Sequence, residues 1–170
     1  MKKIPYKTDQ KNPLIVQYKK DVEGGQLIYD FLKESNFIED VRDGESLLQA
    51  IRAWMYIIRR SKLTIQNILN THKILMKGKL DKENLGKFRK QPVWIGGHEA
   101  KPWYVIPEMM KIWVDGVNQT IDIHLYKEKI KGIEEIIKEE HVSFEAIHPW
   151  VDGNGRLGRI LLNWQRDKVG

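Results

Sequence analysis

The chain has 170 residues, no cysteine and a formal net charge of +6, from 29 Lys and Arg against 23 Asp and Glu. The absence of cysteine excludes disulfides and thiolate chemistry, and it fits the reducing cytoplasm in which we expect the protein to reside. No run of about 18 apolar residues predicts a membrane-spanning helix, and the basic start leads into no apolar signal segment. A chain of this length typically folds as one unit, so we expect a single domain over residues 1–170.

The positive charge is spread along the chain and forms no dense basic block. An excess of this size is compatible with a polyanionic partner, either nucleic acid or the phosphates of a nucleotide. The even spacing favours a mildly basic, solvated surface over a nucleic-acid face. We therefore expect no membrane partner and do not favour a nucleic-acid partner.

The first part of the chain predicts three helices after a weakly patterned start. Residues 1–20 contain two prolines and few periodic apolar residues, so we expect them to be loosely ordered. Residues 24–35 predict a short helix, and residues 45–60 and 64–77 carry apolar side chains at helical spacing. Gly78 suits the end of the third helix.

The middle of the chain interrupts the helical pattern. Residues 89–107 contain the β-favouring runs "VWI" and "WYV" on either side of a glycine pair, which predicts an irregular β-hairpin. Pro107 is suited to the first turn of a following helix. Residues 126–148 read as one long amphipathic helix, with or without a break. Pro149 disfavours helical geometry at His148 and predicts the end of that helix.

A last helix is predicted to begin near Asn154, where apolar residues follow at positions i, i+3, i+4 and i+7. The expected fold is therefore mainly α, with one β-hairpin. The turn before this last helix belongs to the segment "HPWVDGNGRLGR", residues 148–159, which concentrates the reactive side chains of the sequence.

The second half of that segment predicts an anion site. The first N–H groups of a helix have no partner within the helix and, with the helix dipole, they attract phosphate. Gly153 and Gly155 allow a phosphate to approach the backbone because no Cβ intervenes. Asn154 adds an amide donor.

Charged side chains extend this predicted site. Arg156 and Arg159 are three residues apart, so they share one face of the helix and suit a polyphosphate. Asp152 precedes the anion hole and is a candidate ligand for Mg²⁺, which commonly takes only one or two protein carboxylates. These residues predict binding of a polyphosphate with a magnesium ion.

His148 is the only candidate base in the segment. A neutral imidazole there can accept the proton of a hydroxyl group that attacks phosphorus. Taken separately, a His-Pro pair is usually structural and "DGNG" is usually a tight turn. A calcium loop is disfavoured because the twelfth position from Asp152 is Asn163 and not glutamate. Together, and in this order at a helix start, the residues favour phosphoryl-type transfer.

The segment closely resembles the signature of the Fic family, HPFx[D/E]GNGRxxR, with Trp150 in place of phenylalanine. The resemblance covers roughly residues 35–165. It implies a helical Fic-like core with a β-hairpin flap that holds the target protein by strand pairing. The flap residues would be Val93, Trp94, Ile95 and Gly96.

The resemblance also implies the activity and the roles of the site residues. The reaction would be transfer of AMP from ATP to a Ser, Thr or Tyr hydroxyl of a target protein. His148 would be the base and Asp152 the Mg²⁺ ligand. The phosphates would be held by the other residues of the motif, with Arg159 on the γ-phosphate and the rest around the remaining phosphates: Gly153, Asn154, Gly155 and Arg156.

A second resemblance concerns control. Many Fic proteins carry an inhibitory helix with the pattern [S/T]xxxE[G/N], and residues 24–40 form the candidate segment, which ends in "SNFIED" from Ser35 to Asp40. Glu39 would pair with Arg159 and occupy the place of the γ-phosphate. Asp40 departs from the expected Gly or Asn. The alternative interpretation is that Glu39 is an ordinary exposed glutamate.

Two other functions remain open from the sequence. A Fic scaffold can use another nucleotide or transfer another phosphate-containing group. The chain can also be a non-catalytic module that binds nucleotides or nucleic acid. The test between transfer reactions is whether label from the α or the γ position of ATP reaches protein.

Overall fold

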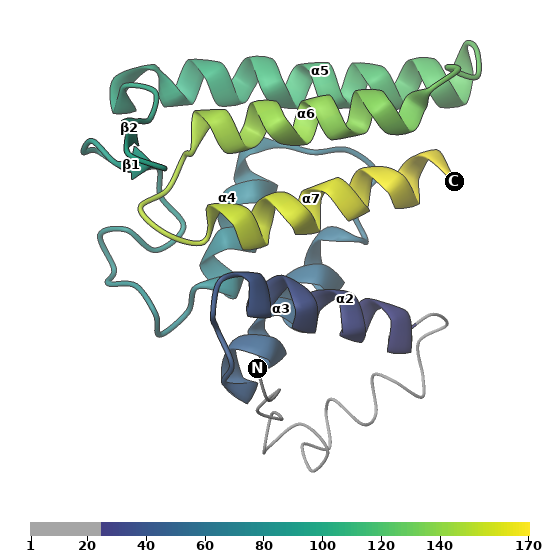
Figure 1. Ribbon diagram of the computed structural model, residues 1–170. Coiled ribbons are helices and arrows are strands. Elements are labelled where there is room, and N and C mark those ends of the chain that lie inside the picture. The colour runs from purple at the N-terminus through teal and green to yellow at the C-terminus, as the bar shows by residue number, and fades with distance from the viewer. Residues whose placement is uncertain (1–24) are drawn as a thin grey trace.

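The structure is a computed structural model that describes residues 25–170; residues 1–20, expected to be loosely ordered, lie outside the described part. Six α-helices, a small hairpin and a 3-10 turn make up this part of the chain (Figure 1). In chain order the elements are α2 (Gly25–Ile38), α3 (Gly44–Ile57), α4 (Ile65–Leu75), β1 (Trp94–Ile95), β2 (His98–Glu99), η2 (Trp103–Val105), α5 (Ile106–Tyr126), α6 (Ile133–Ile147) and α7 (Asn154–Val169). The prediction of a mainly α fold with one hairpin is confirmed.

Local sequence signals set the helix ends. The side chain of Asp43 caps α3 by accepting a hydrogen bond from the backbone N–H of Ser46 at 2.8 Å. Thr64 caps α4 in the same way, with the N–H of Asn67 at 3.1 Å. Such caps stabilise a helix by about 1 kcal/mol each, because they satisfy N–H groups that lack partners within the helix. Gly78, predicted to follow the third helix, has a φ of 76°.

The hairpin is smaller than the sequence predicted. Trp94 pairs with Glu99 and Ile95 with His98 in antiparallel register. The run "WYV", expected to be a strand, instead forms the 3-10 turn η2, so that part of the prediction was wrong. The N–H of Val105 donates to the carbonyl of Pro102 at 3.2 Å, which makes the backbone bonding of this segment local. It leads directly into α5, whose first turn contains a proline with φ already set for a helix.

The helix predicted over residues 126–148, with or without a break, is broken in the structure. Residues up to Tyr126 belong to α5, a turn follows, and α6 begins only at Ile133. Gly132 has a φ of 76°, which is incompatible with a continuous right-handed helix. Within the turn, Nδ1 of His124 accepts the N–H of Ile130 at 3.0 Å. The sequence left the break open because its periodic apolar pattern continues across this turn and no strong turn signal marks it.

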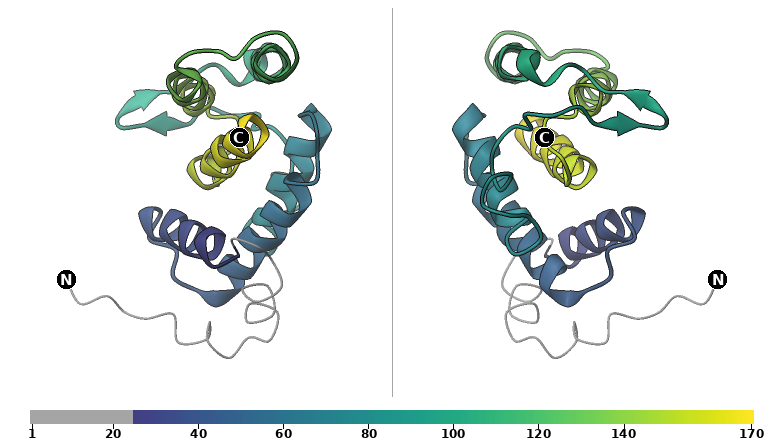
Figure 2. Two further views of the ribbon diagram at one scale, coloured as in Figure 1. Left: turned by 90° about the vertical axis from the view of Figure 1, so that its right-hand side faces the viewer. Right: turned by 90° about the vertical axis from the view of Figure 1, so that its left-hand side faces the viewer.

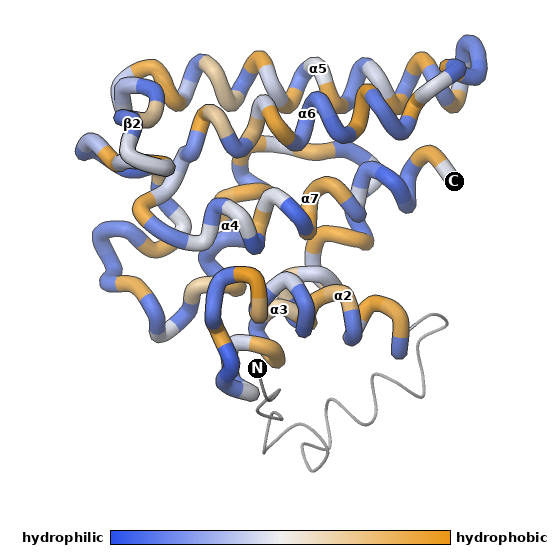
Figure 3. The backbone as a smooth tube through the Cα atoms, in the orientation of Figure 1, coloured by the Kyte–Doolittle hydropathy of each residue, from blue (hydrophilic) through white to orange (hydrophobic). Residues whose placement is uncertain are grey.

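Helix α7 lies in the middle of the molecule, between the α5–α6 pair and the helices α2, α3 and α4 (Figures 1 and 2). It contacts α2, α4, α5 and α6. Apolar and polar residues alternate along the helices (Figure 3). The apolar positions fill one core that includes Trp54, Trp113 and Trp164. This burial fixes the first turn of α7, and with it the preceding motif loop. Among the helices of residues 25–170, none has the length and apolar character that a membrane crossing requires.

Candidate active site

The motif forms the loop between α6 and α7. Helix α6 ends at Ile147, and His148 takes a left-handed conformation with φ 50°. Gly153 has a φ of 85°, and a Cβ at this position would lie 2.7 Å from the sulfur of Met76. The predicted stop before Pro149 and the predicted helix start near Asn154 are both observed. The chain therefore takes a left-handed conformation at both ends of the loop, at His148 after α6 and at Gly153 before α7.

Asn154 holds the loop from inside. Its Oδ1 accepts the N–H of Trp150 at 2.9 Å, and its Nδ2 donates to the carbonyl of Trp150 at 2.8 Å. The side chain is almost fully buried. The amide that the sequence predicted to face a phosphate is therefore used within the loop. Its backbone N–H, at the first position of α7, is a separate donor that this bonding does not use.

Trp150 fills the position that the signature gives to phenylalanine, and it is fully buried. Its indole stacks on the imidazole of His72, with ring centroids 4.6 Å apart and planes 11° apart. Nδ1 of His72 accepts the N–H of Gly86 at 3.0 Å, so Nε2 carries the proton and donates to the carbonyl of Asp152 at 3.0 Å. Burial lowers the pKa of His72 to about 4 and keeps the ring neutral. His72 is a core residue that also supports the motif loop.

Arg89 is a buried residue that the sequence analysis did not single out. Its Nε donates to the carbonyl of His148 at 2.8 Å, and its two terminal nitrogens donate to the carbonyls of Gln91 and Lys101 at 2.9 and 2.5 Å. Its own N–H donates to the carbonyl of Pro149 at 2.9 Å. One guanidinium thus joins both ends of the hairpin segment to the loop. A single arginine among many cations gave no sequence signal.

The imidazole of His148 is half-buried, with Nδ1 3.4 Å from the carbonyl oxygen of Glu145. A carbonyl only accepts, so Nδ1 carries the proton and Nε2 keeps its lone pair. Burial is the main cause that lowers the pKa of His148 below its usual value. The ring is therefore neutral at neutral pH, which is the form that a base requires.

Arg156 is a buried cation with few partners. Arg156 is 4% exposed. One of its terminal nitrogens contacts the sulfur of Met76 at 3.1 Å, and the same nitrogen lies 3.7 Å from Oδ1 of Asp152. Its Nε is buried and has no hydrogen-bond partner. A buried charge with weak compensation is energetically unfavourable, so this position favours an added anion.

Asp152 has the exposure that a metal ligand needs. Its side chain is 61% exposed, and only Oδ1 is engaged, accepting the N–H of Gly153 at 2.6 Å. Within residues 25–170 there is no group of three or more acidic, His or Cys residues that would bind a metal alone. One carboxylate beside a phosphate site is still sufficient for Mg²⁺, which keeps waters and takes phosphate oxygens as ligands. Asp152 and Arg156 line a cavity of about 600 Å³, a volume in the range of ligand sites.

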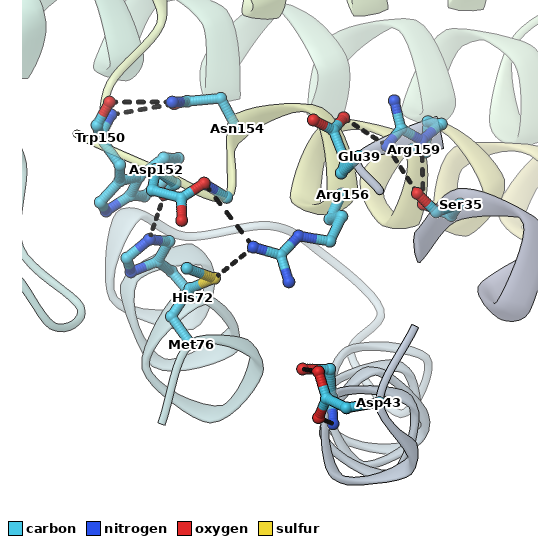
Figure 4. Close-up of polar contacts among 12 residues, drawn as sticks. Ser35, Glu39, Asp43, His72, Met76, Trp150, Asp152, Asn154, Arg156 and Arg159 are labelled. Atoms are coloured by element: carbon cyan, nitrogen blue, oxygen red, sulfur yellow. Dashed lines mark hydrogen bonds and ion pairs between the residues drawn. The ribbon is translucent and has the colours of Figure 1, made fainter. Parts of the chain in front are cut away.

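Arg159 is held by the end of α2 (Figure 4). Its Nε donates to Oγ of Ser35 at 2.9 Å, and one terminal nitrogen donates to the carbonyl of Ser35 at 3.0 Å and to Oε1 of Glu39 at 2.7 Å. A Cβ at Gly155 would collide with the same Oε1. The Glu39 carboxylate therefore lies over the first turn of α7, between the backbone and Arg159.

Asp40 stands where the family pattern has Gly or Asn. The backbone conformation at this position explains why the pattern favours those two residues. Its φ is 55°, in the left-handed region that Gly, Asn and Asp tolerate best. Its carboxylate pairs with Arg42 at 2.8 Å in an exposed position. The departure thus leaves the turn after α2 intact.

The hairpin lies beside the end of α6, as the shared cavity indicates. Trp94 and Ile95 are exposed, and Gly96 has a φ of 56° in the turn. The carbonyl of Val93 accepts the N–H of Ala100 at 2.9 Å. A cavity of about 290 Å³ separates the hairpin from Ala146 on α6. The structure thus brings Glu39 against Gly155 and Arg159 of the motif and places the hairpin beside the last turn of α6.

The sequence of this chain is similar to those of known proteins. Residues 62–165 match the Fic/DOC family. The chain is 28% identical over 107 residues to Protein adenylyltransferase Fic of Drosophila willistoni and 27% identical to that of Drosophila virilis, in each case over 63% of this chain. It spans only about a fifth of the length of these curated relatives, 20% and 21%.

Solved structures agree in fold. A Fic-domain-containing signaling protein from Bacteroides thetaiotaomicron superposes with a TM-score of 0.70 at 20% identity, over 97% of this chain and 70% of that protein. Fic-1 of C. elegans superposes with a TM-score of 0.58 at 24% identity, over 73% of this chain and 36% of that one. Because the family match spans most of the chain and includes the whole motif, this protein belongs to the Fic/DOC family.

Proposed function

We propose that this protein transfers AMP from ATP to a Ser, Thr or Tyr hydroxyl of a target protein. The observation that carries the proposal is that one short loop joins a neutral, half-buried His148 at the end of α6 to a buried, weakly compensated Arg156 in the first turn of α7. The name of the curated relatives, protein adenylyltransferase, supports AMP as the transferred group. We further propose a cytoplasmic location, which the cysteine-free sequence favours.

In this reaction the hydroxyl oxygen forms a bond to the α-phosphorus of ATP, and the bond between that phosphorus and the α–β bridging oxygen breaks. Pyrophosphate leaves, and Nε2 of His148 takes the hydroxyl proton. Arg89 holds the backbone carbonyl of this histidine, and the Glu145 carbonyl holds its Nδ1 side. Base catalysis of this type contributes about 10²–10⁴ in rate.

The phosphates are bound by the start of α7. The backbone N–H groups from Gly153 to Gly155 and the guanidinium of Arg156 receive the α- and β-phosphates. Asn154 contributes its backbone N–H, while its amide maintains the loop. Asp152 would hold Mg²⁺, which would neutralise phosphate charge when bound. The target segment pairs with the hairpin at Val93–Gly96 and brings its hydroxyl to His148.

Glu39 is the proposed inhibitory carboxylate. It occupies the guanidinium of Arg159 and the space over Gly155, where we place the γ-phosphate. Both side chains are partly exposed, at 39% and 19%, and pairs of this kind stabilise by about 1 kcal/mol or less. A contact of that strength is displaced readily by a partner or by mutation.

The test is incubation of the Glu39→Gly protein with Mg²⁺ and ATP labelled at either the α or the γ position. Label from the α position on protein, and none from the γ position, is the expected result. Label from the γ position alone would replace this proposal with phosphoryl transfer. The His148→Ala variant in the same background should lose the label while its thermal unfolding is unchanged. Absence of label with either ATP, despite nucleotide binding, would favour a non-catalytic nucleotide-binding module.

A further inference from the structure

Glu145 is a half-buried carboxyl group that the proposed reaction does not use. It lies on the last turn of α6 and faces α7 at Gly158, where a Cβ would collide with its Oε1. The absence of a side chain at Gly158 therefore lets the carboxyl group rest against the α7 backbone, one residue before Arg159.

This carboxyl group lacks the bonds that a buried acid normally has. Its Oε1 is buried and has no hydrogen-bond partner. Burial raises the pKa of Glu145 to about 7; the charge of Arg159 lowers it, and the charge of Glu39 raises it. His141 also faces Gly158 from α6, and Nδ1 of His148 lies near the Glu145 backbone carbonyl.

We propose that Glu145 sets the strength of the Arg159 anion site, and thereby the preference of the protein for a nucleotide with a γ-phosphate. When the carboxyl group is protonated, the full charge of Arg159 acts on the anion in front of it. That anion is Glu39 in this structure and the γ-phosphate in the proposed complex. When Glu145 is ionised, it competes for the same guanidinium and repels that anion.

The proposal follows from the reciprocity of coupled binding. If Glu39 makes ionisation of Glu145 harder, then ionised Glu145 must weaken the docking of Glu39 by the same factor. A γ-phosphate carries at least the charge of a carboxylate, so it is disfavoured at least as strongly. ADP lacks the group that would face Arg159 and should be nearly insensitive to Glu145. This inference rests on the proposed placement of the γ-phosphate, but the link between Glu39 and Glu145 does not.

The first experiment therefore needs no nucleotide. The carboxyl carbon of Glu145 is titrated by NMR in the wild-type chain, in Glu39→Gln and in Glu34→Gln. Glu34 is an exposed glutamate on α2, the helix that ends just before Glu39. We expect the pKa of Glu145 to fall in Glu39→Gln and to stay unchanged in Glu34→Gln. An unchanged value in Glu39→Gln would overturn the proposal.

The second experiment measures nucleotide preference. ATP and ADP affinities are determined calorimetrically at pH 5.5 and 8 for Glu39→Gln and for Glu39→Gln/Glu145→Gln. The preference for ATP over ADP should fall by about fivefold more between these pH values when Glu145 is present than when it is glutamine. The protonation of ATP itself is common to both proteins and cancels. Equal changes in the two proteins would overturn the proposal.

The two proposals fail in different ways. If the titration shows coupling but neither nucleotide binds, the coupling of Glu39 and Glu145 stands and the proposed function is wrong. If α-label is transferred but the titration shows no coupling, the proposed function stands and Glu145 is only a structural residue. The thermal unfolding of Glu145→Gln, which we expect to match the wild-type protein at low pH, confirms that the fold is unchanged.

Discussion

The motif loop and the end of α2 both face the start of α7, but they are held in very different ways. The loop is fixed by buried groups: Trp150 is fully buried, and Asn154 and Arg89 are each 2% exposed. At the end of α2, Ser35 is buried, but the carboxylate proposed to inhibit belongs to Glu39, whose side chain is 39% exposed. The proposed chemistry is thus built into the core, whereas the proposed inhibition uses a surface contact that can be released without unfolding.

This difference follows from the energetics of polar groups. A buried hydrogen bond is expensive to leave unmade, because the remaining partner cannot turn to water. An exposed ion pair exchanges its partner for water at little cost. Changes in the loop should therefore reduce stability, and changes at the end of α2 should mainly alter nucleotide binding.

The largest effect is expected for Asn154→Ala. This change leaves both the N–H and the carbonyl of Trp150 without partners inside the protein, which should lower the free energy of unfolding by about 3–4 kcal/mol. Urea unfolding followed by circular dichroism measures it. Asn163→Ala on the same helix is the control, since Asn163 makes only one bond, to the carbonyl of Arg159. Equal losses in both variants would show that the loop is no more strongly held than the helix surface.

A somewhat smaller effect is expected from acid at His72. Its pKa is about 4 in the folded protein, against an ordinary value of 6.5, so between these values the unfolded chain binds the proton and the folded chain does not. Stability is therefore lost as pH falls, by roughly 2.5 kcal/mol between pH 7 and 4.5. Urea unfolding at the two pH values measures this loss.

The His72→Gln variant isolates the contribution, because every other titrating group is common to both proteins. Its free energy of unfolding should be lower than that of the wild-type protein at pH 7 but should fall less on acidification. A pH dependence as steep as that of the wild-type protein would mean that His72 is not held neutral beneath Trp150.

Much of this arrangement could be predicted from sequence. Helical periodicity located the helices, and Pro149 marked the end of α6. The resemblance to the Fic signature placed Glu39 opposite Arg159, and the two are in contact at 2.7 Å. The inhibitory role of that contact remains a prediction.

The supporting residues could not be predicted, because their bonds join segments far apart in the chain. Arg89 binds the carbonyl of His148, 59 positions away, and His72 binds that of Asp152, 80 positions away. The local sequence pattern also predicted the wrong secondary structure where tertiary context determines it. The run "WYV" was expected to be a strand but forms a 3-10 turn directly before α5. The sequence therefore predicted the residues proposed to bind the nucleotide better than the residues that hold the motif loop in place.

At the end of α2 we expect an effect on binding and little on stability. Glu39→Gln removes the charge opposite Arg159 and should raise ATP affinity roughly fivefold, the equivalent of about 1 kcal/mol. Calorimetric titration at pH 7 measures this. Glu34→Gln, on α2 itself, should leave the affinity unchanged. If ATP affinity is the same with and without the Glu39 charge, the contact has no inhibitory role.

The smallest effect is expected at Asp40, where the sequence departs from the family pattern. Asp40→Asn removes only an exposed pair with Arg42 and keeps a residue that tolerates a φ of 55°, so ATP affinity should change by less than about twofold. Asp40→Val keeps the chain length but places a β-branched residue in the left-handed region, at a cost of roughly 1–2 kcal/mol. That strain should loosen the end of α2 and raise ATP affinity toward that of Glu39→Gln. If Val and Asn behave alike, the turn after α2 does not hold Glu39 in place, and the contact with Arg159 is maintained by Ser35 and the helix alone.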